Sequence, residues 1–261
     1  MGAEFPKISV VTPNYNQADF IGETIKSVLS QDYPNLEYIV IDGGSDDGSV
    51  SEIKKYEDSL AYWVSEKDNG MYDAINKGFA KATGDIMCWI NSDDVLWEGA
   101  LHYVAKVFSE NRGVQWLQGY PSVIDEAGAL LYQRDPVGSK FHFLIGIHKK
   151  DYSFIQQEST FWSRSLWEQA GGQLNTNCKL AADFDLWMRF FEHETLYCTR
   201  KQLAAFRKRA GQQSENMEAY LKEAGQSIAT FKEKQSIFER LKWNFTAAKK
   251  KRQLAKRINW L

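Results

Sequence analysis

A regular alternation of apolar runs and helical periodicities over residues 8–94 constrains the fold more than any other feature of the sequence. Short apolar runs predict four strands, at Ile8–Thr12, Leu36–Ile41, Ala61–Ser65 and Ile86–Ile90. Between these runs, apolar side chains recur three or four positions apart, which predicts a helix in each connection. Strands and helices that alternate in this way form a parallel sheet with right-handed crossovers. The sequence therefore predicts an α/β fold with a mostly parallel sheet flanked by helices.

The pattern changes after Asp94. The remaining expectations, in chain order, are a helix at Ala100–Phe108, a strand at Val114–Gly119, a hairpin around Asp125–Gly128, loops and short strands over Gly138–Ser163, helices at Ser165–Ala170 and Phe184–Phe191, and a strand at Leu196–Thr199. From Glu215 onward the pattern is helical and lacks proline, which indicates a C-terminal helical appendage.

Composition narrows the class of protein. The 261 residues carry a net charge of −2, so the overall charge does not favour nucleic acid as a partner. The three cysteines lack metal-ligand spacing and are odd in number, which is typical of a reducing cytosol. No apolar run reaches the length that crosses a bilayer, and no signal peptide is recognisable. We therefore expect a cytoplasmic protein that does not bind nucleic acid.

Charge is distributed unevenly along the chain. Residues 232–261 contain ten Lys or Arg and two acids, a net +8 in a chain of net −2. Trp243, Phe245, Ile258 and Trp260 lie among these cations. A basic helix with aromatic side chains can lie on an anionic membrane surface. A solvated tail and a contact between subunits are the alternatives, and the pattern alone does not choose among the three.

Two adjacent carboxylates, Asp93 and Asp94, follow the predicted strand Ile86–Ile90. Like charges next to a buried strand are costly unless a cation neutralises them. The carboxyl ends of parallel strands are also the usual ligand sites of open α/β sheets. The pair therefore predicts a site for Mn²⁺ or Mg²⁺, although two acids at a strand end also fit an ordinary solvated turn.

Polar residues also follow the neighbouring strands. Asp42 ends the second strand and opens a Gly-rich loop, where its carboxylate can accept a hydrogen bond from an imide N–H such as N3 of uracil. Tyr15 follows the first strand and can stack on the same base. The structural alternatives are an Asx turn for Asp42 and a half-buried rim position for Tyr15.

The helix predicted after Gly70 completes this edge of the sheet. Its polar side carries Asp73 and Asn76, and its N-terminus can offer N–H groups to an anion, although such polar faces are usually only solvated. Because the ends of parallel strands meet at one edge, the loop Glu66–Gly70 joins Asp42 and the acidic pair there. Together, these residues offer a contact for the base, contacts for the ribose and a metal for the diphosphate. This combination is what a nucleotide-sugar site requires.

Four motifs carry a resemblance to a known family. They are Thr12–Asn16 (TPNYN), Asp42–Ser49 (DGGSDDGS), Asp68–Gly78 (DNGxxDAxNxG) and Asn91–Asp94 (NSDD). In this order and spacing, over roughly residues 8–214, the chain resembles the family 2 inverting glycosyltransferases. The resemblance implies the GT-A fold, which is a Rossmann-like form of the predicted sheet. The first acid of the last motif is often Asp in the family and is Asn91 here, so the metal-ligand assignment within the acidic pair stays open.

The resemblance also implies roles for single residues. Asp42 would contact the base, Asp93 the ribose, and Asp94 the Mn²⁺ or Mg²⁺ on the diphosphate. The full set of nucleotide-sugar contacts would be Pro13, Tyr15, Asp42, Asp68, Gly70, Asp73, Asn76, Ser92 and Asp93.

An acidic motif further along the chain would act on the acceptor. Inverting transfer uses a base to deprotonate the acceptor hydroxyl, and by resemblance this base is Asp183, with Asp185 as its close competitor. Without the resemblance, two acids in the first turn of a helix would only complement its dipole. The acceptor side would be lined by Gln157, Glu158, Trp162 and Trp187.

A late segment departs from the family. Relatives often carry His at the position of Arg209, so a third metal ligand of that type is absent here. Arg207 or Arg209 could instead contact the diphosphate, and a plain surface cation is the alternative.

We therefore predict a metal-dependent inverting glycosyltransferase that moves a sugar from a nucleotide diphosphate sugar, preferably a UDP-sugar, to a hydroxyl of a saccharide or lipid-linked acceptor. A GT-A domain would span residues 6–214, with a nucleotide-sugar-binding half (6–95) and an acceptor half (96–214). A helical basic C-terminal segment, 215–261, would follow. Its residues 232–261 would contact either the anionic inner face of the plasma membrane or another subunit. The alternatives are a degenerate transferase that serves as a sugar-binding or scaffold subunit, and a sugar-phosphate nucleotidyltransferase. The second would need a Gly-rich basic loop near the first strand, which Pro13–Gln17 lacks.

Overall fold

An eight-stranded sheet forms the centre of the computed structural model, which describes residues 5–212 and 216–261 except for the side chains of residues 240, 242 and 244. The strand order is β12-β10-β6-β9-β4-β1-β2-β3, and every neighbouring pair is parallel except the two that involve β9. The strands are β1 (Ile8–Asn14), β2 (Leu36–Asp42), β3 (Tyr62–Ser65), β4 (Ile86–Trp89), β6 (Trp116–Gln118), β9 (Thr160–Ser163), β10 (Tyr197–Cys198) and β12 (Asn259–Trp260).

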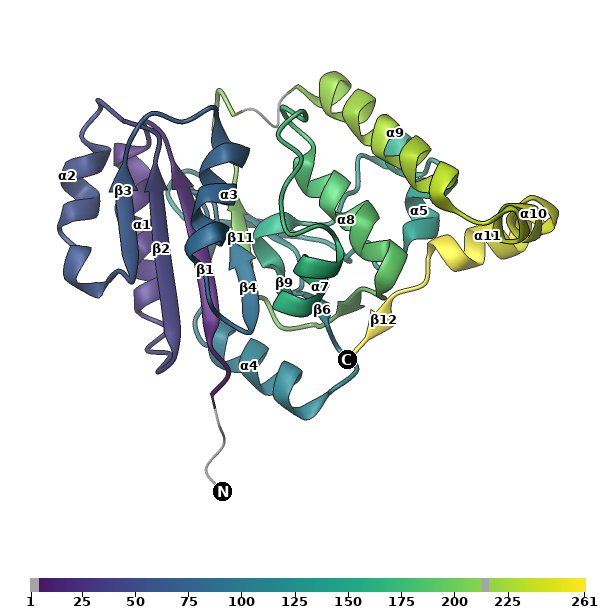
Figure 1. Cartoon of the computed structure of the whole chain (residues 1–261), viewed down its shortest axis with the longest axis horizontal. Coiled ribbons are helices and arrows are strands. Elements are labelled where there is room, and N and C mark those ends of the chain that lie inside the picture. Colours follow the sequence, from purple (N-terminus) through teal and green to yellow (C-terminus); the bar gives the residue numbers. More distant parts are fainter. Residues whose placement is uncertain (1–4, 213–215) are drawn as a thin grey trace.

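Helices lie on both faces of this sheet. In Figure 1, α3 lies in front of the strands and α1 behind them. The helices that follow the first strands are α1 (Ala18–Leu29), α2 (Ser49–Lys54), α3 (Met71–Lys81) and α4 (Ala100–Glu110). Those of the second half are α5 (Lys140–Leu144), α6 (His148–Asp151), α7 (Arg164–Gln169) and α8 (Ala182–His193), with short 3₁₀ turns at Glu57–Ser59 and Gln157–Ser159. The predicted α/β fold with a mostly parallel, helix-flanked sheet is confirmed.

Burial explains why the first half could be predicted. Strand β1 is buried along its whole length, as expected for a parallel strand covered on both faces. Helix α1 buries Ile21, Ile25 and Val28, which recur at the spacing of one helical face. Each strand predicted before Asp94 is present, with boundaries that differ by at most two residues.

A second, four-stranded sheet supports the ends of the main one. Its order is β5-β11-β7-β8, with β5 (Val95–Leu96), β11 (Ala204–Arg207), β7 (Ser122–Ile124) and β8 (Leu130–Gln133). The antiparallel pair β7–β8 is the predicted hairpin. Strands β5 and β11 were not predicted, because two to four residues are too few to show a period. Over Gly138–Ser163, where we expected loops and short strands, the chain also forms helices α5 and α6.

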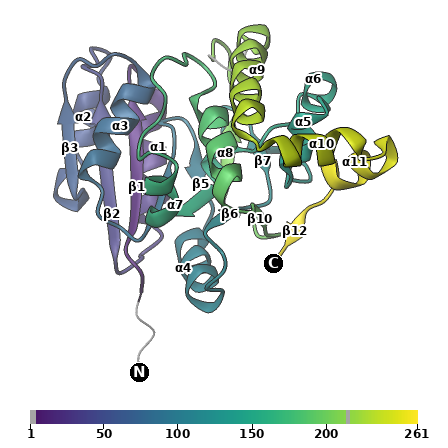
Figure 2. The same ribbon diagram turned by 45° about the vertical axis from the view of Figure 1, so that its right-hand side comes forward.

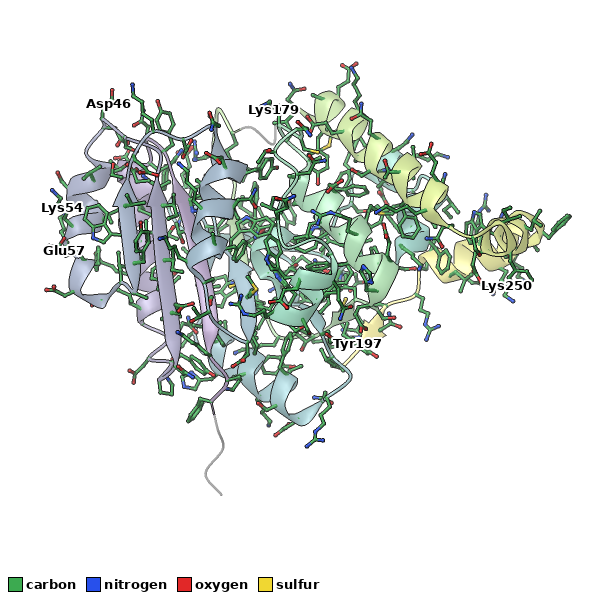
Figure 3. All side chains as sticks on the ribbon, viewed as in Figure 1. Asp46, Lys54, Glu57, Lys179, Tyr197 and Lys250 are labelled. Carbon is green, nitrogen blue, oxygen red and sulfur yellow. The ribbon has the colours of Figure 1, made fainter. Side chains whose placement is uncertain are left out.

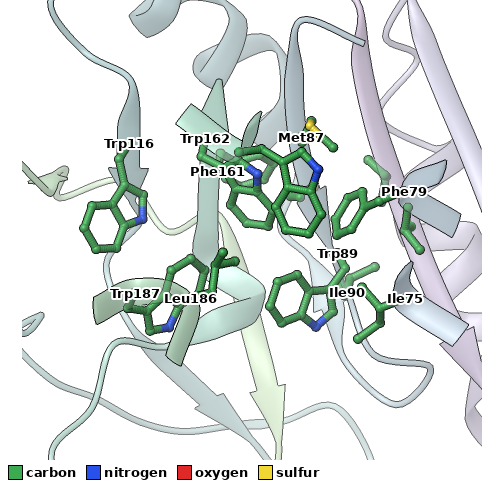
Figure 4. Packing of buried hydrophobic residues seen from close by; sticks show 14 of the residues in the cluster. Ile75, Phe79, Met87, Trp89, Ile90, Trp116, Phe161, Trp162, Leu186 and Trp187 are labelled. Atoms are coloured by element: carbon green, nitrogen blue, oxygen red, sulfur yellow. The ribbon is translucent and has the colours of Figure 1, made fainter. Parts of the chain in front are cut away.

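An aromatic cluster fills the middle of the core (Figure 4). Trp89, Trp116, Trp162 and Trp187 are at most 1 % exposed. The rings of Trp89 and Trp187 stack with centroids 6.0 Å apart, and Trp162 meets Trp187 edge-on at 5.7 Å. Trp162 and Trp187, which we expected on the acceptor side, therefore lie in the core and present no ring face to a sugar in this structure.

The C-terminal segment is only in part an appendage. Helices α9 (Met217–Lys234), α10 (Ile237–Phe245) and α11 (Ala248–Ala255) follow one another, and α10 and α11 extend away from the sheet in both views (Figures 1 and 2). The chain then returns as β12, which pairs with β10 in the main sheet. Trp260 stacks on Tyr120 at 6.4 Å, so the last residues belong to the core domain. The expected boundary between residues 214 and 215 lies outside the described residues.

One buried side chain makes the stability of this fold sensitive to acid. His148 is fully buried among Phe143, Phe154 and Phe184, and neither ring nitrogen has a hydrogen-bond partner in the part of the chain that the structure describes. Burial, reinforced by nearby His142 and Lys149, lowers the pKa of His148 from 6.5 to about 4. The imidazole is thus neutral in the fold, whereas the unfolded chain takes up a proton below pH 6.5.

We predict that this histidine costs stability as the pH falls from about 6.5 to about 4. By linkage the loss approaches roughly 3 kcal/mol at the acid end. His148→Phe should remove that part of the pH dependence, whereas the matched change at exposed His193 should leave it intact. Urea unfolding of the three proteins at several pH values measures the difference. Parallel pH profiles for the native chain and His148→Phe would contradict the prediction.

Candidate functional site

The expected base reader, Asp42, is buried at the end of β2 and accepts several hydrogen bonds. The side chains of Asn14 and Ser65 each donate to it at 2.6 Å, and the backbone N–H and hydroxyl of Ser45 donate at 3.0 and 2.5 Å. Burial alone would raise the pKa of Asp42, but these hydrogen bonds outweigh it and hold the pKa below its ordinary value. Asp42 is therefore ionised and fixes the loop that follows β2.

Tyr15 and Asp68 both lie close to the Gly43 backbone. A Cβ atom at Gly43 would come within 2.8 Å of a carboxylate oxygen of Asp68 and 3.3 Å of the Tyr15 ring, so glycine is what lets both side chains approach. Tyr15 is 63 % exposed, which leaves its ring open to a stacking partner. Pro13, which precedes these residues in β1, is buried.

The start of α3 is organised by its own polar residues. Asp68 accepts a hydrogen bond from the N–H of Gly70, and Asp73 accepts one from the N–H of Asn69. The side-chain amide of Asn76 donates to the carbonyl of Leu174 at 3.0 Å and accepts from its N–H at 2.7 Å. These two hydrogen bonds connect α3 to a loop that lies more than ninety residues away in the sequence. Gly70 has a φ of +108°, a conformation that L side chains rarely adopt.

The acidic pair lies at the end of β4 and is less exposed than a solvated turn would be. Asp93 is 9 % exposed and Asp94 is fully buried. Asp94 accepts a hydrogen bond from the N–H of Arg207 at 2.8 Å and one from the Asn91 amide at 3.3 Å. Ser92, which precedes Asp93, is buried, and its backbone carbonyl accepts a hydrogen bond from the hydroxyl of Thr24.

Negative charge accumulates around Asp94. Burial, followed by the carboxylates of Asp93 and Glu158, raises its pKa well above the ordinary value. Glu158 is 3 % exposed, one of its oxygens has no partner, and burial raises its pKa to about 7. Its neighbour Gln157 is also buried and donates to the carbonyl of Trp89. Asp93, Asp94 and Glu158 therefore bring carboxylates close together at the end of β4.

The two late arginines have different surroundings. Arg207 is fully buried, so it is not a surface cation, and its guanidinium donates to the carbonyls of Asp93 and Glu126 and to the Glu23 carboxylate. Every terminal nitrogen is thus used within the protein. Arg209 instead pairs with Asp93 at 2.8 Å, and its side chain keeps 18 % exposure. Unlike Arg207, Arg209 is partly exposed, so its guanidinium can leave Asp93 and contact a ligand instead.

A pocket of about 540 Å³ opens beside the N-terminus of α3. Its lining combines the start of α3 with the loop before α8 and with Gln212, which also donates to Asp93 at 3.2 Å. Gly70 and Asp73 are the expected site residues that line it. The lining residues are Asn69, Gly70, Met71, Tyr72, Asp73, Thr176, Cys178, Lys179, Leu180, Gln212 and Asn216.

Asp183 stands in the first turn of α8, directly after the loop that lines this pocket. It is partly buried, and its two oxygens accept the hydroxyl of Tyr220 at 3.1 and 3.3 Å. Burial raises the pKa of Asp183 to about 6, although the hydrogen bond from Tyr220 acts in the opposite direction. Asp185, the competing residue, forms an ion pair with Arg189 at 2.9 Å. Among the described residues, Asp183 has no cation within ion-pair distance, whereas Asp185 has Arg189.

Helix α9 also contacts Asp183 and the loop before it. The sequence did not predict these contacts. Glu223 accepts the three successive N–H groups of Lys179, Leu180 and Ala181 at 2.9 to 3.2 Å and so fixes the pocket loop. Tyr72 of α3 donates to the carbonyl of Leu180 on the same loop. In Figure 3 Lys179 lies beside the start of α9. Nothing in the sequence pattern of α9 marks these contacts, because packing against α8 creates them.

Carboxylates follow the ends of the parallel strands β2 and β4, which is where open α/β sheets place their ligands. The family model for glycosyl transferase family 2 matches residues 9–166, more than half of the chain. The chain therefore belongs to glycosyl transferase family 2.

Relatives agree with this assignment. The chain is 46 % identical to an uncharacterized glycosyltransferase of Mycobacterium tuberculosis over 187 residues, which is 70 % of this chain and 68 % of the relative. It is 29 % identical to one of Rickettsia prowazekii over 211 residues, 79 % of this chain and 65 % of the relative. The chain thus spans about two thirds of the length of these relatives.

Two solved structures show the same fold. Staphylococcus aureus TarS (residues 1–349, in complex with UDP-GlcNAc) superimposes with a TM-score of 0.69 at 18 % identity, over 95 % of this chain and 70 % of that chain. A mannosyltransferase from Pyrobaculum calidifontis, in complex with GDP-Man and Mn²⁺, gives 0.57 at 19 % identity, over 80 % of this chain and 59 % of that chain. The predicted family and GT-A fold are thus confirmed.

The contact between Tyr220 and Asp183 generates a prediction about pH. Tyr220→Phe removes a hydrogen bond that favours the ionised form, so the pKa of Asp183 should rise. The acid limb of the kcat/KM profile for sugar transfer should then move to higher pH, with a roughly two- to fivefold loss near the native pKa and little loss well above it. Tyr132→Phe, at an exposed residue, serves as control. An equal loss at every pH would show that Tyr220 is only a packing residue.

Proposed function

We propose that this protein is a metal-dependent inverting glycosyltransferase that transfers a sugar from a nucleotide diphosphate sugar to an acceptor hydroxyl. The observation that carries the proposal is Asp183, a carboxylate with a pKa raised to about 6 and no cation on it, at the end of the loop that lines the pocket. A general base needs an ionised form at working pH and a pKa near it.

The donor half is proposed to lie between the ends of β1, β2 and β4. Exposed Tyr15 would stack on the base, and the Asp42 carboxylate would accept its imide N–H. The oxygens of Asp42 already accept internal hydrogen bonds, so a base would replace one of them, such as that from Ser65. An acceptor at this position suits the N3–H of uracil, which supports UDP as the carrier, with dTDP and GDP as alternatives.

The residues at the end of β4 fit a divalent cation. Asp94 and Glu158 have raised pKa values because burial and neighbouring carboxylates oppose their charge, and a partnerless oxygen of Glu158 lies among them. Among the described residues no group of three or more His, Cys, Asp or Glu could hold a metal alone. An Mn²⁺ or Mg²⁺ ion bound by one or two carboxylates and by the donor's phosphates is consistent with both the raised pKa values and the lack of a complete set of protein ligands in the described part of the chain. Such an ion would neutralise the diphosphate as it leaves.

Arg209 is proposed to take part on the donor side. In the absence of donor it pairs with Asp93 at 2.8 Å. A ribose or a diphosphate that engages Asp93 or the guanidinium would break this pair and free Arg209 to contact a phosphate, for which its planar donors are suited. Arg209 would thus occupy the place where relatives often carry His.

Transfer then requires Asp183 to accept the proton of an acceptor hydroxyl. The hydroxyl oxygen attacks the anomeric carbon from the face opposite the nucleotide, the bond to the diphosphate breaks, and the configuration inverts. Glu223 and Tyr220 would hold Asp183 and the pocket loop in position for this step. The acceptor class is a saccharide or a lipid-linked saccharide. The proposed location is the cytoplasm, and three free, buried cysteines are compatible with it.

A substitution at the proposed base tests the mechanism. Asp183→Asn should lower kcat by about 10²- to 10⁴-fold because it deletes the proton acceptor. UDP binding should be unchanged, because the donor half is untouched. Asp185→Asn is the matched control and should keep most of the activity, since it changes the contacts with Arg189 and Ser227 and leaves Asp183 in place. An inactive Asp185→Asn beside an active Asp183→Asn would exchange the two roles.

A second substitution tests the metal site. Asp94→Asn keeps an acceptor for the N–H of Arg207, whereas Asp94→Ala would leave that buried N–H unpaired. The ligand-free variant should be as stable as the native chain or more so, because a charge opposed by burial is gone. Its thermal stabilisation by UDP with Mn²⁺ should be lost.

The same thermal-shift measurement identifies the nucleotide. UDP, dTDP, GDP and CMP are each compared with and without Mn²⁺, and the largest metal-dependent shift should belong to UDP. A native chain that UDP stabilises equally with and without Mn²⁺ would remove the metal from the proposal. A larger shift with GDP would replace UDP as the carrier.

A further inference from the structure

Helix α10 presents an apolar stripe to solvent. Ile237, Phe238, Leu241 and Phe245 are 76, 72, 49 and 86 % exposed. At 3.6 residues per turn, these four positions fall within one sector about 100° wide. Contiguous exposed apolar surface on a monomer usually marks an interaction site.

The opposite side of α10 already packs on the protein. Trp243 stacks on Phe141 of α5, with ring centroids 4.9 Å apart and planes within 18°. The amine of Lys251 in α11 lies over the Trp243 ring, 4.8 Å from its centroid. The helix is therefore anchored through one face, and the outward stripe contributes nothing to that anchoring.

Cations follow the stripe directly. Lys249, Lys250 and Arg252 of α11 are exposed, and so are Lys256 and Arg257 after it. In Figure 3 Lys250 lies at the projecting end formed by α10 and α11. We call residues 237–257 the arm. The arm thus joins an outward apolar stripe to a group of exposed positive charges.

We propose that the arm docks on an anionic lipid surface, with the α10 stripe inserted at the headgroup boundary and the α11 cations on the headgroups. The contact differs from the sequence expectation, because Trp243 and Trp260 pack within the protein and the inserting residues are Ile237, Phe238, Leu241 and Phe245. No helix among the described residues has the length and hydropathy to cross a bilayer, so the contact is a surface one. The inference goes beyond the proposed function and does not depend on which sugar is transferred.

Charge favours lipid over a second copy of this chain. A symmetric dimer through the stripe would bring the same patch of both copies together, and with it two sets of α11 cations. Like charges at such short range repel, whereas an anionic surface attracts every one of them. Anionic lipid therefore complements both parts of the arm.

Sedimentation of the full-length chain with vesicles tests the proposal. Phosphatidylcholine vesicles that contain phosphatidylglycerol should bind the protein, pure phosphatidylcholine vesicles should bind it weakly, and added salt should release it. Phe238→Asp should weaken binding at least about tenfold, because a charge replaces an inserted ring. Leu131→Asp is the matched control, since Leu131 is 50 % exposed and lies on β8, which is not part of the arm. A truncation is unsuitable because it would remove β12 from the sheet.

A charge-reversal pair tests the other half of the arm. Lys249→Glu with Lys250→Glu should abolish the preference for anionic vesicles, whereas Lys54→Glu with Lys106→Glu, at exposed residues of α2 and α4, should retain it. Full-length protein that does not bind anionic vesicles at low salt overturns the proposal. So does a dimer seen by sedimentation equilibrium without lipid that Phe238→Asp dissociates, because the stripe would then be a subunit contact.

Discussion

The acidic site depends on one buried cation, Arg207. Its guanidinium donates to the carbonyls of Asp93 and Glu126 and to the Glu23 carboxylate, while its backbone N–H donates to Asp94. Burial of a guanidinium without acceptors would lower the free energy of unfolding by several kcal/mol. The fold therefore depends on all of these hydrogen bonds being formed. The residue comes from β11, and its partners come from the end of β4, from the β7–β8 turn and from α1. Strand β11 of the second sheet, which the sequence did not predict, therefore fixes the position of Asp94.

A similar dependence places Asp183. The loop before α8 turns three N–H groups toward Glu223, and α9 supplies both this carboxylate and the Tyr220 hydroxyl on Asp183. A carboxylate that accepts successive backbone N–H groups fixes a loop more firmly than a neutral acceptor does. Helix α9 therefore fixes the loop that lines the pocket and is not a separate appendage. The appendage begins later, where α10 and α11 leave the sheet.

Residues whose position follows from the main chain could be predicted from the sequence, and those placed by tertiary packing could not. Asp42 and Asp93 were predicted because buried apolar runs end at them, and the ends of parallel strands share one edge. Tyr220 and Glu223 carry no such signal, since only the packing of α9 on α8 brings them to Asp183. Trp162 and Trp187 lie near acceptor-side motifs in the sequence. Each is nevertheless on the buried face of its strand or helix, so its ring packs in the core. Arg207 and Arg209 are two residues apart, but only Arg207 lies in β11 and becomes buried.

The cost of the buried acids links stability to binding. A carboxylate whose pKa is raised in the fold, as for Asp94 and Glu158, is ionised more readily in the unfolded chain. Its contribution to folding therefore becomes unfavourable as the pH rises above the ordinary carboxylate pKa, and remains so above the raised value. At neutral pH the ligand-free protein carries this cost. A divalent cation would favour the ionised forms and reverse it, so part of the energy of donor binding would appear as stability of the folded state. Under the proposed metal-dependent mechanism, this electrostatic cost at the end of β4 would couple the binding of the metal to the binding of the donor.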